Sequence, residues 1–579
     1  MSDRRSNTLR CCCRAAGPPV DRTLETSEWI RGRRCKGCLS PNLSGKRTEL
    51  FHFSCASCAV YLNFWQEYPF AGIPVFLRKG RIHFINGLRD IVAMVNGEVN
   101  DFVWGLPMLV LLVGTGILMT VLTKGFQLSH FRFWMAHTVG AIFKNKHVTA
   151  HTGKEDRSIS QFQSLCTALA ATIGTGNIAG VAAAIAAGGP GAIFWMWIVA
   201  IFGMMTNFSE NVLGIYYRRK NAAGEWSGGA MYYLRDGLGS FRGCKQLGKV
   251  LGLLFSIFCI FASFGIGNMG QINSIATNMR AVFSIPNWVT GVFLMAVAAL
   301  VVVGGLKRIA AVTEKLVPVM ALLYVVGALA IVAMNYRSIL PAFASIFKGA
   351  FAMKAVGGGI VGSGVKAAVT WGMKRGVFSN EAGLGSSVMV HSSSNVKEPV
   401  AQGMWGIFEV FADTLVVCTL TALVILTSGL VDLNTGAVLT SMEKTAMVAE
   451  AFSLHFGSFG SAFIAIAILL FAFSTVLGWS HYGTKAFEYL FGTKTTIFYK
   501  IVFVLFTIVG ATMQLDLAWD LSDTFNGLMA IPNLIGVVAL SGLVRKITRN
   551  FVDRRICGKD VEPMYSAFAD VQQEQEVQP

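Results

Sequence analysis

Charged side chains are scarce in this sequence. Only 14% of its 579 residues are Asp, Glu, Lys or Arg, whereas an ordinary soluble protein has about 25%. This deficit, together with a hydrophobic content of 53%, excludes a typical soluble enzyme, a disordered chain and a coiled coil. The composition instead predicts a membrane protein that crosses the bilayer several times.

Several motifs of energy-coupled or catalytic chemistry are also absent from the sequence. It contains no Gly-x4-Gly-Lys-Ser/Thr loop, which argues against ATP-driven transport. It has neither a His–Glu metal motif nor a nucleophile elbow. We therefore expect neither a membrane-bound enzyme nor a cofactor.

The net charge of +17, from 49 Lys and Arg against 32 Asp and Glu, would by itself fit a nucleic-acid-binding protein. The basic residues, however, lie in clusters between long apolar runs, as in the cytoplasmic loops of a membrane protein. The predicted partner is therefore a lipid bilayer and not a nucleic acid.

Residues 1–93 differ in composition from the rest of the chain. They hold 15 Lys and Arg against 7 Asp and Glu, and 7 of the 12 Cys. The favoured interpretation is a mis-assigned start, with Met94 as the true first residue, and an unstructured extension is an alternative. A third interpretation is a zinc site, because two Cys-x2-Cys pairs can supply four thiolate ligands. Its ligands would be Cys35, Cys38, Cys55 and Cys58.

Long apolar segments recur from residue 103 onward. Because about 20 apolar residues are enough for a membrane-spanning helix, the sequence predicts an all-α membrane protein with eleven transmembrane helices. The predicted spans are 103–122, 163–187, 190–216, 250–279, 288–306, 316–334, an irregular one within 351–387, 404–430, 459–481, 497–513 and 521–544.

Basic residues fall in every second loop between these spans. Since cytoplasmic loops are enriched in Lys and Arg, this alternation predicts an N-terminus outside and a C-terminus inside a bacterial cytoplasmic membrane. The basic loop residues include Lys124, Arg132, Lys144, Arg218, Arg219, Lys220, Lys307, Arg308, Lys374, Arg375, Lys485, Lys494, Arg545 and Lys546.

Ten spans follow the first one, and they divide into two groups of five with opposite orientation. This is the geometry of an inverted-repeat transporter. The predicted parts are an N-terminal segment (1–93), a first helix with its basic loop (94–160), two repeats (161–337 and 338–545) and a cytoplasmic tail (546–579).

Glycine interrupts the first helix of both predicted repeats. The first carries Ile173-Gly-Thr-Gly-Asn177, and the second carries Gly357-Gly-Gly359 followed by Gly362-Ser-Gly364. Glycine lets the backbone leave helical geometry, and two Gly-interrupted helices at matching positions indicate a transporter's binding site. Close helix packing through small residues is the alternative.

A break after Ile173 would expose two kinds of backbone group. The half-helix that begins near Asn177 offers free N–H groups, which suit a carboxylate. The half-helix that ends near Ile173 offers free carbonyl oxygens, which suit Na⁺. Thr172 and Thr175 add hydroxyl groups, and no titratable side chain is present in this run, which favours coupling to Na⁺.

Two acidic residues, Glu409 and Asp413, lie one helical turn apart inside the eighth predicted span. Charged groups within a span are functional by default, so proton coupling through this pair is an alternative to Na⁺ coupling. A structural ion pair with Arg375 is a further interpretation. A passive channel is less well supported, because a pore needs repeated rings of ligands.

Four long motifs occur in order along the chain. They are Gly174-Thr-Gly-Asn-Ile-Ala-Gly-Val181, Gly188-Gly-Pro-Gly-Ala-Ile-Phe-Trp-Met-Trp197, Gly228-Gly-Ala-Met-Tyr-Tyr-Leu234 and Arg375-Gly-Val-Phe-Ser-Asn-Glu-Ala-Gly-Leu-Gly385. Over about residues 100–545 the sequence resembles the alanine or glycine:cation symporter family. One departure is Ala230, where the family usually has Pro.

The resemblance implies a leucine-transporter-type core and symport of alanine or glycine with Na⁺. It also implies substrate contacts from the first and third helices of the first repeat and from the third helix of the second. The substrate-binding residues would be Thr172, Gly174, Thr175, Gly176, Asn177, Gln271, Thr475 and Trp479. The Na⁺ ligands would be Ala170, Ile173, Ser474 and Thr475.

The residue types alone leave other roles open for some of these positions. Gln271 could hydrogen-bond a neighbouring helix, and Trp479 could lie at the membrane interface. The hydroxyls of Ser474 and Thr475 could bond carbonyls of their own helix. Glu381 is expected at a cytoplasmic gate or in a loop that it stabilises.

Overall fold

The computed structural model of the chain describes residues 91–153, 156–351, 363–513 and 516–577. The predicted zinc ligands Cys35, Cys38, Cys55 and Cys58, and the question of where the chain starts, fall outside these residues.

Helices dominate the described chain, as the apolar runs predict. The longer ones are α3 (Leu106–Leu122), α8 (Gln161–Thr172), α9 (Val181–Gly188), α10 (Gly191–Tyr216), α12 (Lys245–Phe264), α13 (Gly270–Phe283), α14 (Asn287–Val302), α15 (Gly305–Met334), α16 (Ile339–Phe351), α17 (Ser363–Asn380), α19 (Pro399–Val410), α20 (Thr419–Thr427), α21 (Lys444–Phe456), α22 (Ser458–Phe491), α23 (Thr496–Thr512), α24 (Asp516–Ala539), α25 (Ser541–Arg555) and α26 (Ala569–Val577). A short antiparallel hairpin pairs β1 (Arg219–Lys220) with β2 (Trp226–Ser227).

Within the described residues, seven helices are long and apolar enough to cross a membrane, or up to nine spans if each of two bent pairs counts as one. These helices overlap the predicted spans, and α14 coincides with the fifth but has only 16 residues. The chain is therefore a multi-pass membrane protein. The seventh predicted span, 351–387, includes residues 352–362, which lie outside the described chain.

The predicted interruption of the second span is present. A reciprocal cap between Ser160 and Gln163 starts α8, and the helix ends at Thr172. The chain then leaves α-helical geometry and resumes as α9, at an angle of 50° to α8. This break gives the helix ends that the sequence predicts around Gly174 and Gly176.

A second interruption lies between α17 and the short helix α18 (Val388–His391). Gly383 (φ 94°), Gly385 (φ 73°) and Glu381 (φ 55°) all adopt positive φ here. The sequence predicted the second break at the Gly357–Gly364 run. Gly364 instead lies inside α17, and the earlier glycines of that run are outside the described residues.

Lys374 and Arg375 were predicted to lie in a cytoplasmic loop, and this prediction is wrong because both belong to α17. Their charges are accommodated within the helix bundle. Lys374 Nζ lies 2.8 Å from a carboxylate oxygen of Asp523, and the Arg375 guanidinium lies 5.3 Å from the ring centres of Trp371 and Phe378. A paired cation can therefore occupy a helix that the distribution of basic residues assigns to a loop.

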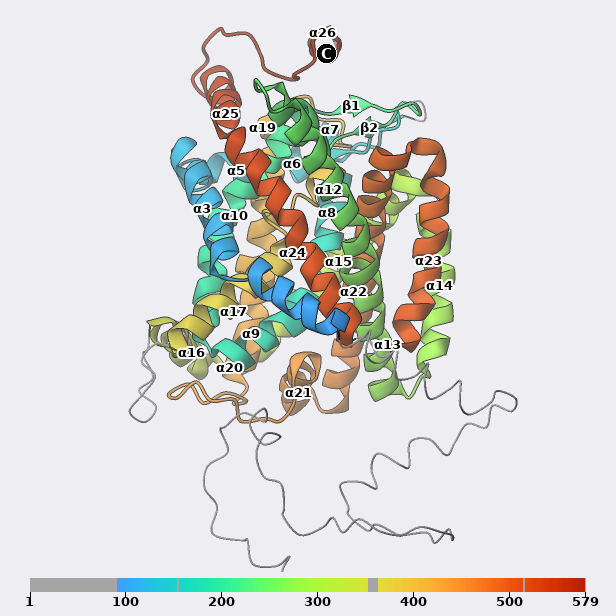
Figure 1. Ribbon diagram of the computed structural model, residues 1–579. Helices are drawn as coiled ribbons and strands as arrows, with labels where there is room; N and C mark the ends of the chain where they lie inside the picture. The colour runs from blue at the N-terminus through green and yellow to red at the C-terminus, as the bar shows by residue number, and fades with distance from the viewer. Residues whose placement is uncertain (1–90, 154–155, 352–362, 514–515, 578–579) are drawn as a thin grey trace, which may run out of the picture. The chain divides into compact units, whose positions relative to one another are not determined.

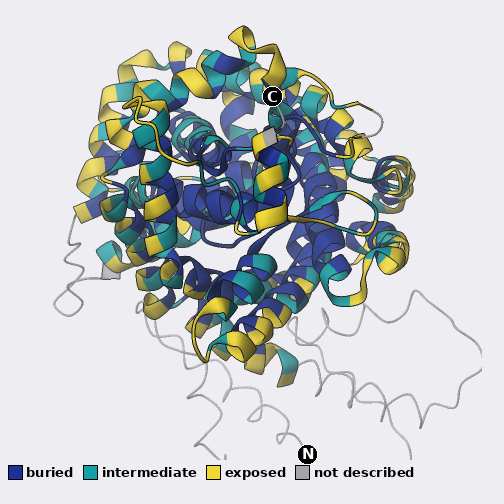
Figure 2. Ribbon diagram, turned by 90° about the horizontal axis from the view of Figure 1, so that it is seen from above, coloured by how far each residue is buried: buried dark blue, intermediate teal, exposed yellow. Residues whose placement is uncertain are grey.

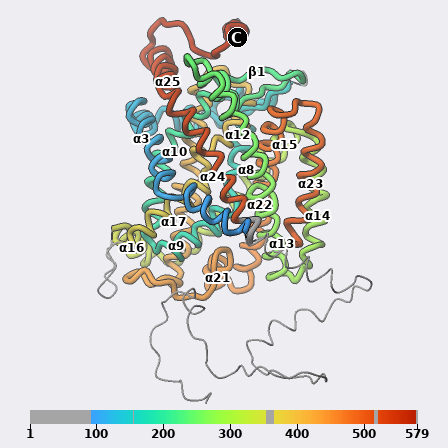
Figure 3. Tube along the Cα trace, in the orientation of Figure 1, coloured from blue at the N-terminus to red at the C-terminus, as the bar shows by residue number. Residues whose placement is uncertain are grey.

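The interrupted segments are enclosed by continuous helices. Helix α10 packs against α17 and α19, and α22 packs against α8, α12 and α13. The hairpin and α25 lie at one end of this bundle, and α9, α16 and α21 lie at the opposite end (Figure 1). Figure 3 traces α22 and α24 through the bundle between these ends.

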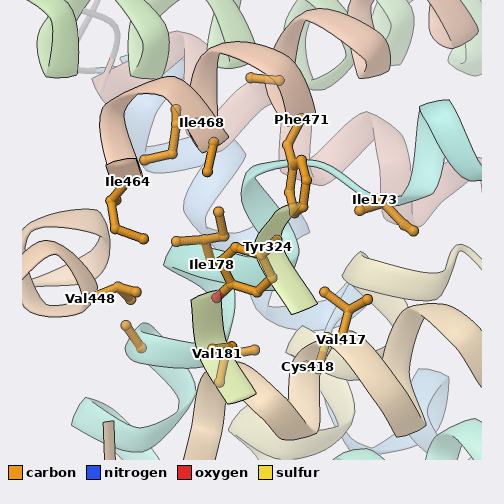
Figure 4. Packing of buried hydrophobic residues seen from close by; sticks show 14 of the residues in the cluster. Ile173, Ile178, Val181, Tyr324, Val417, Cys418, Val448, Ile464, Ile468 and Phe471 are labelled. Carbon is orange, nitrogen blue, oxygen red and sulfur yellow. The ribbon is translucent and has the colours of Figure 1, made fainter. Parts of the chain in front are cut away.

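The inner helices are buried and the outer ones carry exposed apolar side chains (Figure 2). Phe293, Leu300 and Leu322 are exposed by 63%, 68% and 64%, as expected for a surface that faces lipid and not water. Beside the first break, buried apolar side chains such as Ile173 and Phe471 pack together (Figure 4).

Candidate functional site

A small cavity of about 20 Å³ lies at the break between α8 and α9. A space of this size holds about one water molecule. Its lining residues are Ala171, Thr172, Gly174, Gly176, Ile266, Gln271, Phe378, Glu381, Thr475, Trp479 and Asn526. The cavity thus brings together residues of α8 and the break after it, of α13 and the segment before it, of α17 and the segment after it, and of the long helices α22 and α24.

Six of the eight residues predicted to bind substrate line this cavity, namely Thr172, Gly174, Gly176, Gln271, Thr475 and Trp479. The other two, Thr175 and Asn177, lie beside it. Thr175 lines an adjoining cavity. Asn177 is fully buried. Its side-chain amide accepts a hydrogen bond from the backbone of the break and donates one to Asp413, which follows α19 in the chain.

Two backbone N–H groups at the break donate hydrogen bonds to side-chain amide oxygens. The Gly174 N–H donates to Asn177 Oδ1 at 2.9 Å, and the Thr175 N–H donates to Gln271 Oε1 at 3.4 Å. The second bond is long and therefore weak. A carboxylate that entered the cavity could replace Gln271 at this donor, because a charged acceptor makes the stronger hydrogen bond.

Oxygen atoms gather where the end of α8 meets α22. Ser474 Oγ donates to the carbonyl of Ala170 at 3.1 Å and to that of Phe471 at 2.8 Å. Thr475 Oγ1 also donates to the Phe471 carbonyl, at 3.0 Å. Ile173 is the C-terminal cap residue of α8. Ser474 thus contacts Ala170 directly, and Ser474 and Thr475 share the Phe471 carbonyl, which the sequence did not identify.

Gly174 lies directly against Thr475. A Cβ atom at this position would overlap Thr475 Oγ1 and would lie 3.4 Å from Gln271 Oε1. Glycine is therefore required for the close approach of the break to α22.

Trp479 is buried in the cavity wall and not at a membrane interface, since only 2% of its surface is exposed. Its indole Nε1 donates to Glu381 Oε1 at 2.8 Å. The other carboxylate oxygen of Glu381 accepts from Ser386 Oγ. Glu381 thus belongs to the cavity, a place the sequence did not predict for it.

Asp413 and Glu409 are both fully buried but have different partners. Asp413 accepts from Asn177 Nδ2 at 2.6 Å and from Ser379 Oγ at 2.8 Å. Glu409 lies 3.0 Å from His391 Nε2. The interpretation that these carboxylates pair with Arg375 is wrong, because the Arg375 side chain lies against the aromatic rings of α17 instead.

A second cavity, of about 190 Å³, adjoins the first. It is lined by charged groups, including Arg375, Lys444, Asp520 and Asp523. Phe378 lines both cavities, so the two cavities share this side chain.

Comparison with known proteins places the chain in a family. The profile of the sodium:alanine symporter family matches residues 89–565. The chain is 46% identical over 472 residues to the sodium/alanine symporter AgcS of Methanococcus maripaludis, a match that covers 80% of this chain and 98% of that protein. It is 39% identical to an uncharacterized transporter of Haemophilus influenzae, covering 80% and 97% of the two chains.

A further relative carries a different substrate in its name. The chain is 36% identical to the probable sodium/glutamine symporter GlnT of Bacillus subtilis, covering 82% of this chain and 93% of that one. The family and these relatives are transporters and not enzymes. The long apolar helices and the extent of these matches show that the chain belongs to the sodium:alanine symporter family.

Proposed function

We propose that the protein imports a small neutral amino acid, alanine or glycine, together with Na⁺, by alternating access to the cavity at the α8–α9 break. The observation that carries the proposal is the contact between this break and α22. There, predicted Na⁺ ligands and predicted substrate ligands adjoin, and Thr475 belongs to both sets.

The substrate part of the site is small, and it combines apolar side chains with a few hydrogen-bonding groups. The N-terminal end of the helix that resumes after Gly174 supports the substrate carboxylate, as helix N-termini do for anions. The rings of Phe378 and Trp479 limit the space for a side chain. The close packing of these two rings around the cavity supports a substrate with a small side chain, such as alanine or glycine, better than glutamine.

The Na⁺ part of the site consists of oxygen atoms, which this hard cation prefers. Its proposed ligands are the carbonyls of Ala170 and Ile173 and the hydroxyls of Ser474 and Thr475, and the Phe471 carbonyl is a fifth candidate. Because Thr475 borders both parts, Na⁺ and the substrate carboxylate would stabilise each other, and their joint binding would favour the occluded state.

The proposed setting is a bacterial cytoplasmic membrane with the N-terminus outside and the C-terminus inside. The proposed framework is eleven spans, with repeats at 161–337 and 338–545 that each begin with an interrupted helix. The position of the hairpin and α25 at one end of the bundle supports this orientation, because both are rich in basic residues (Figure 1).

Proton coupling through Asp413 is a second candidate. It is supported by the 2.6 Å hydrogen bond from Asn177 to Asp413, which connects a buried carboxylate directly to the break. Glu409 is less directly placed, because its partner is His391.

Uptake of labelled alanine into proteoliposomes separates the two candidates. We expect accumulation when an inward Na⁺ gradient is imposed and none with a proton gradient alone. Accumulation that follows the proton gradient and ignores Na⁺ would refute Na⁺ coupling. Competition by unlabelled glycine and glutamine in the same assay then ranks the substrates, with glutamine expected to be the weakest.

Replacing Ser474 with alanine tests the Na⁺ ligands. Loss of one hydroxyl ligand is expected to raise the half-saturating Na⁺ concentration about tenfold. This change corresponds to the net free energy that one polar contact typically contributes to binding. Ser480→Ala is the matched control, because this hydroxyl is buried on the same helix and donates only to the carbonyl of Leu477. The proposal would be contradicted if both variants had the wild-type dependence on Na⁺.

A further inference from the structure

Glu381 places a carboxylate in the wall of the small cavity. The residue is only 4% exposed, and its two oxygens accept hydrogen bonds from Trp479 and Ser386. A carboxylate has about four acceptor sites. Two of them therefore remain for a further donor.

No cation balances this carboxylate within the described chain. None of the ion pairs formed by the described residues includes Glu381. The charged groups that influence it most, Glu409 and Asp413, are acidic as well. A buried carboxylate without a positive partner is costly, so this cavity is suited to a positively charged group that arrives with the transported solute.

The backbone at Glu381 supports a functional role for its side chain. Its φ of 55° lies in the left-handed region, where a bulky side chain is uncommon and glycine would be unstrained. Strained residues of this kind gather at functional sites. This backbone conformation occurs at the interruption after α17, where the Glu381 side chain lines the cavity.

Asn526 supplies a second acceptor from a different helix. This residue of α24 is 1% exposed and lines the same cavity. Its Oδ1 atom has no hydrogen-bond partner. An acceptor buried without a donor is costly, and a ligand that brings N–H groups would satisfy it.

We propose that Glu381 and Asn526 form the ammonium-binding end of the substrate cavity. This inference rests on the proposed function, since the ligand is the zwitterion of a neutral amino acid. An ammonium group has three N–H donors. One reaches the Glu381 carboxylate and another reaches Asn526 Oδ1, while the substrate carboxylate lies at the helix break on the side of Gly174.

The arrangement makes a free α-ammonium group a requirement for binding. Propionate and lactate resemble alanine in size and carry the carboxylate, but they leave the buried Glu381 charge without a partner. Polar sites reject analogues that lack the expected group far more strongly than apolar pockets reject a missing methyl group. The two carboxylic acids are therefore excluded by charge and not by size.

Binding of labelled alanine to the purified full-length protein in Na⁺ tests the inference. Glu381→Gln is expected to weaken alanine binding at least about 30-fold, because a charge-assisted hydrogen bond in a buried site is lost. The amide oxygen of this variant can still accept from Trp479, so the variant removes the charge and keeps the contact. Glu381→Asp should restore part of the affinity.

Three comparisons complete the experiment. Asn526→Leu should weaken alanine binding about tenfold, the effect of one lost hydrogen bond. Glu314→Gln, on α15 and paired with His151 at the surface, should bind as the wild type does. In the wild type, excess propionate or lactate should not displace alanine, a result that depends on no variant folding correctly.

Thermal stabilisation by Na⁺ in the absence of amino acid shows whether Glu381 binds the substrate ammonium group or Na⁺. Glu381→Gln should keep this stabilisation, which also shows that it is folded. If it loses the stabilisation but is intact by size-exclusion chromatography, Glu381 binds Na⁺ and the inference is wrong. Wild-type alanine affinity in Glu381→Gln, or displacement by propionate, would also overturn it.

Failure of the proposed function has a different signature. Alanine binding that needs Glu381 but uptake that ignores Na⁺ would refute the coupling and leave the ammonium site intact. If the wild type does not bind alanine, the same competition is run with other neutral amino acids and their des-amino acids. Absence of binding by every zwitterion would overturn both proposals.

Discussion

Replacing Asn177 with alanine is expected to reduce Na⁺-driven alanine uptake at least about 100-fold, because two hydrogen bonds in a buried polar network are lost together. Asn177 Oδ1 accepts from the Gly174 N–H at 2.9 Å, and Nδ2 donates to Asp413 Oδ1 at 2.6 Å. The residue is completely buried, so water cannot replace these bonds readily. The variant leaves the Gly174 N–H without its acceptor and removes one of the hydrogen-bond donors to Asp413.

Initial rates of uptake, normalised to the amount of reconstituted protein, measure this effect. Asn278→Ala is the matched control, since its Nδ2 donates only to the carbonyl of Ser274 on its own helix. The control should transport at a rate close to that of the wild type. A rate for Asn177→Ala within threefold of the control would show that the break keeps its geometry without this side chain.

Asn177 also illustrates which part of the site could be predicted from the sequence. Its neighbours Gly174 and Gly176 indicate a break inside a charge-free apolar run, and the structure confirms the break. Local sequence is sufficient here because the break depends on glycine and on helix ends within one short segment. The direction of the Asn177 side chain could not be predicted, because it depends on a bond to Asp413, 236 positions away.

The second break shows the limit of this reasoning. The sequence predicted the second break at the Gly357–Gly364 run, with close helix packing as the alternative, and most of this run lies outside the described residues. The interruption that the structure describes begins at Glu381. The useful signal was the spacing of Gly383 and Gly385, which both adopt positive φ. Glu381 was expected at a gate or in a loop that it stabilises. It lies in the interruption after α17 and accepts from Ser386 there, and it also lines the cavity, which the sequence did not predict.

Residues that complete the cavity from other helices were also missed. Ile266, Phe378 and Asn526 come from three separate segments, and none of them belongs to a motif that suggests a ligand. Their role arises from helix packing, since α22 lies against α12 and α13, while α24 lies against α12. Single-sequence patterns report the period of one helix and not the neighbours that it selects.

Replacing Gly174 with alanine is the smallest change expected to abolish transport. The added Cβ atom would overlap Thr475 Oγ1 and would come into van der Waals contact with Gln271 Oε1. Thr475 borders both the proposed Na⁺ site and the substrate cavity, so its displacement affects both ligands at once. Since the cavity is only about 20 Å³, the methyl group also takes up space that the substrate needs. We expect uptake to fall at least about 100-fold, with weaker binding of alanine and Na⁺ alike.

Gly114→Ala provides the control that separates this local effect from a general effect of glycine replacement. Gly114 lies within α3, and a Cβ atom there would meet no atom within 4 Å. That variant should be at least as stable as the wild type, because alanine favours the helix more than glycine does, and it should transport normally. If Gly174→Ala bound Na⁺ normally and lost only alanine, Thr475 would serve the substrate alone. The two ligands would then be coupled through the backbone of the break and not through this shared side chain.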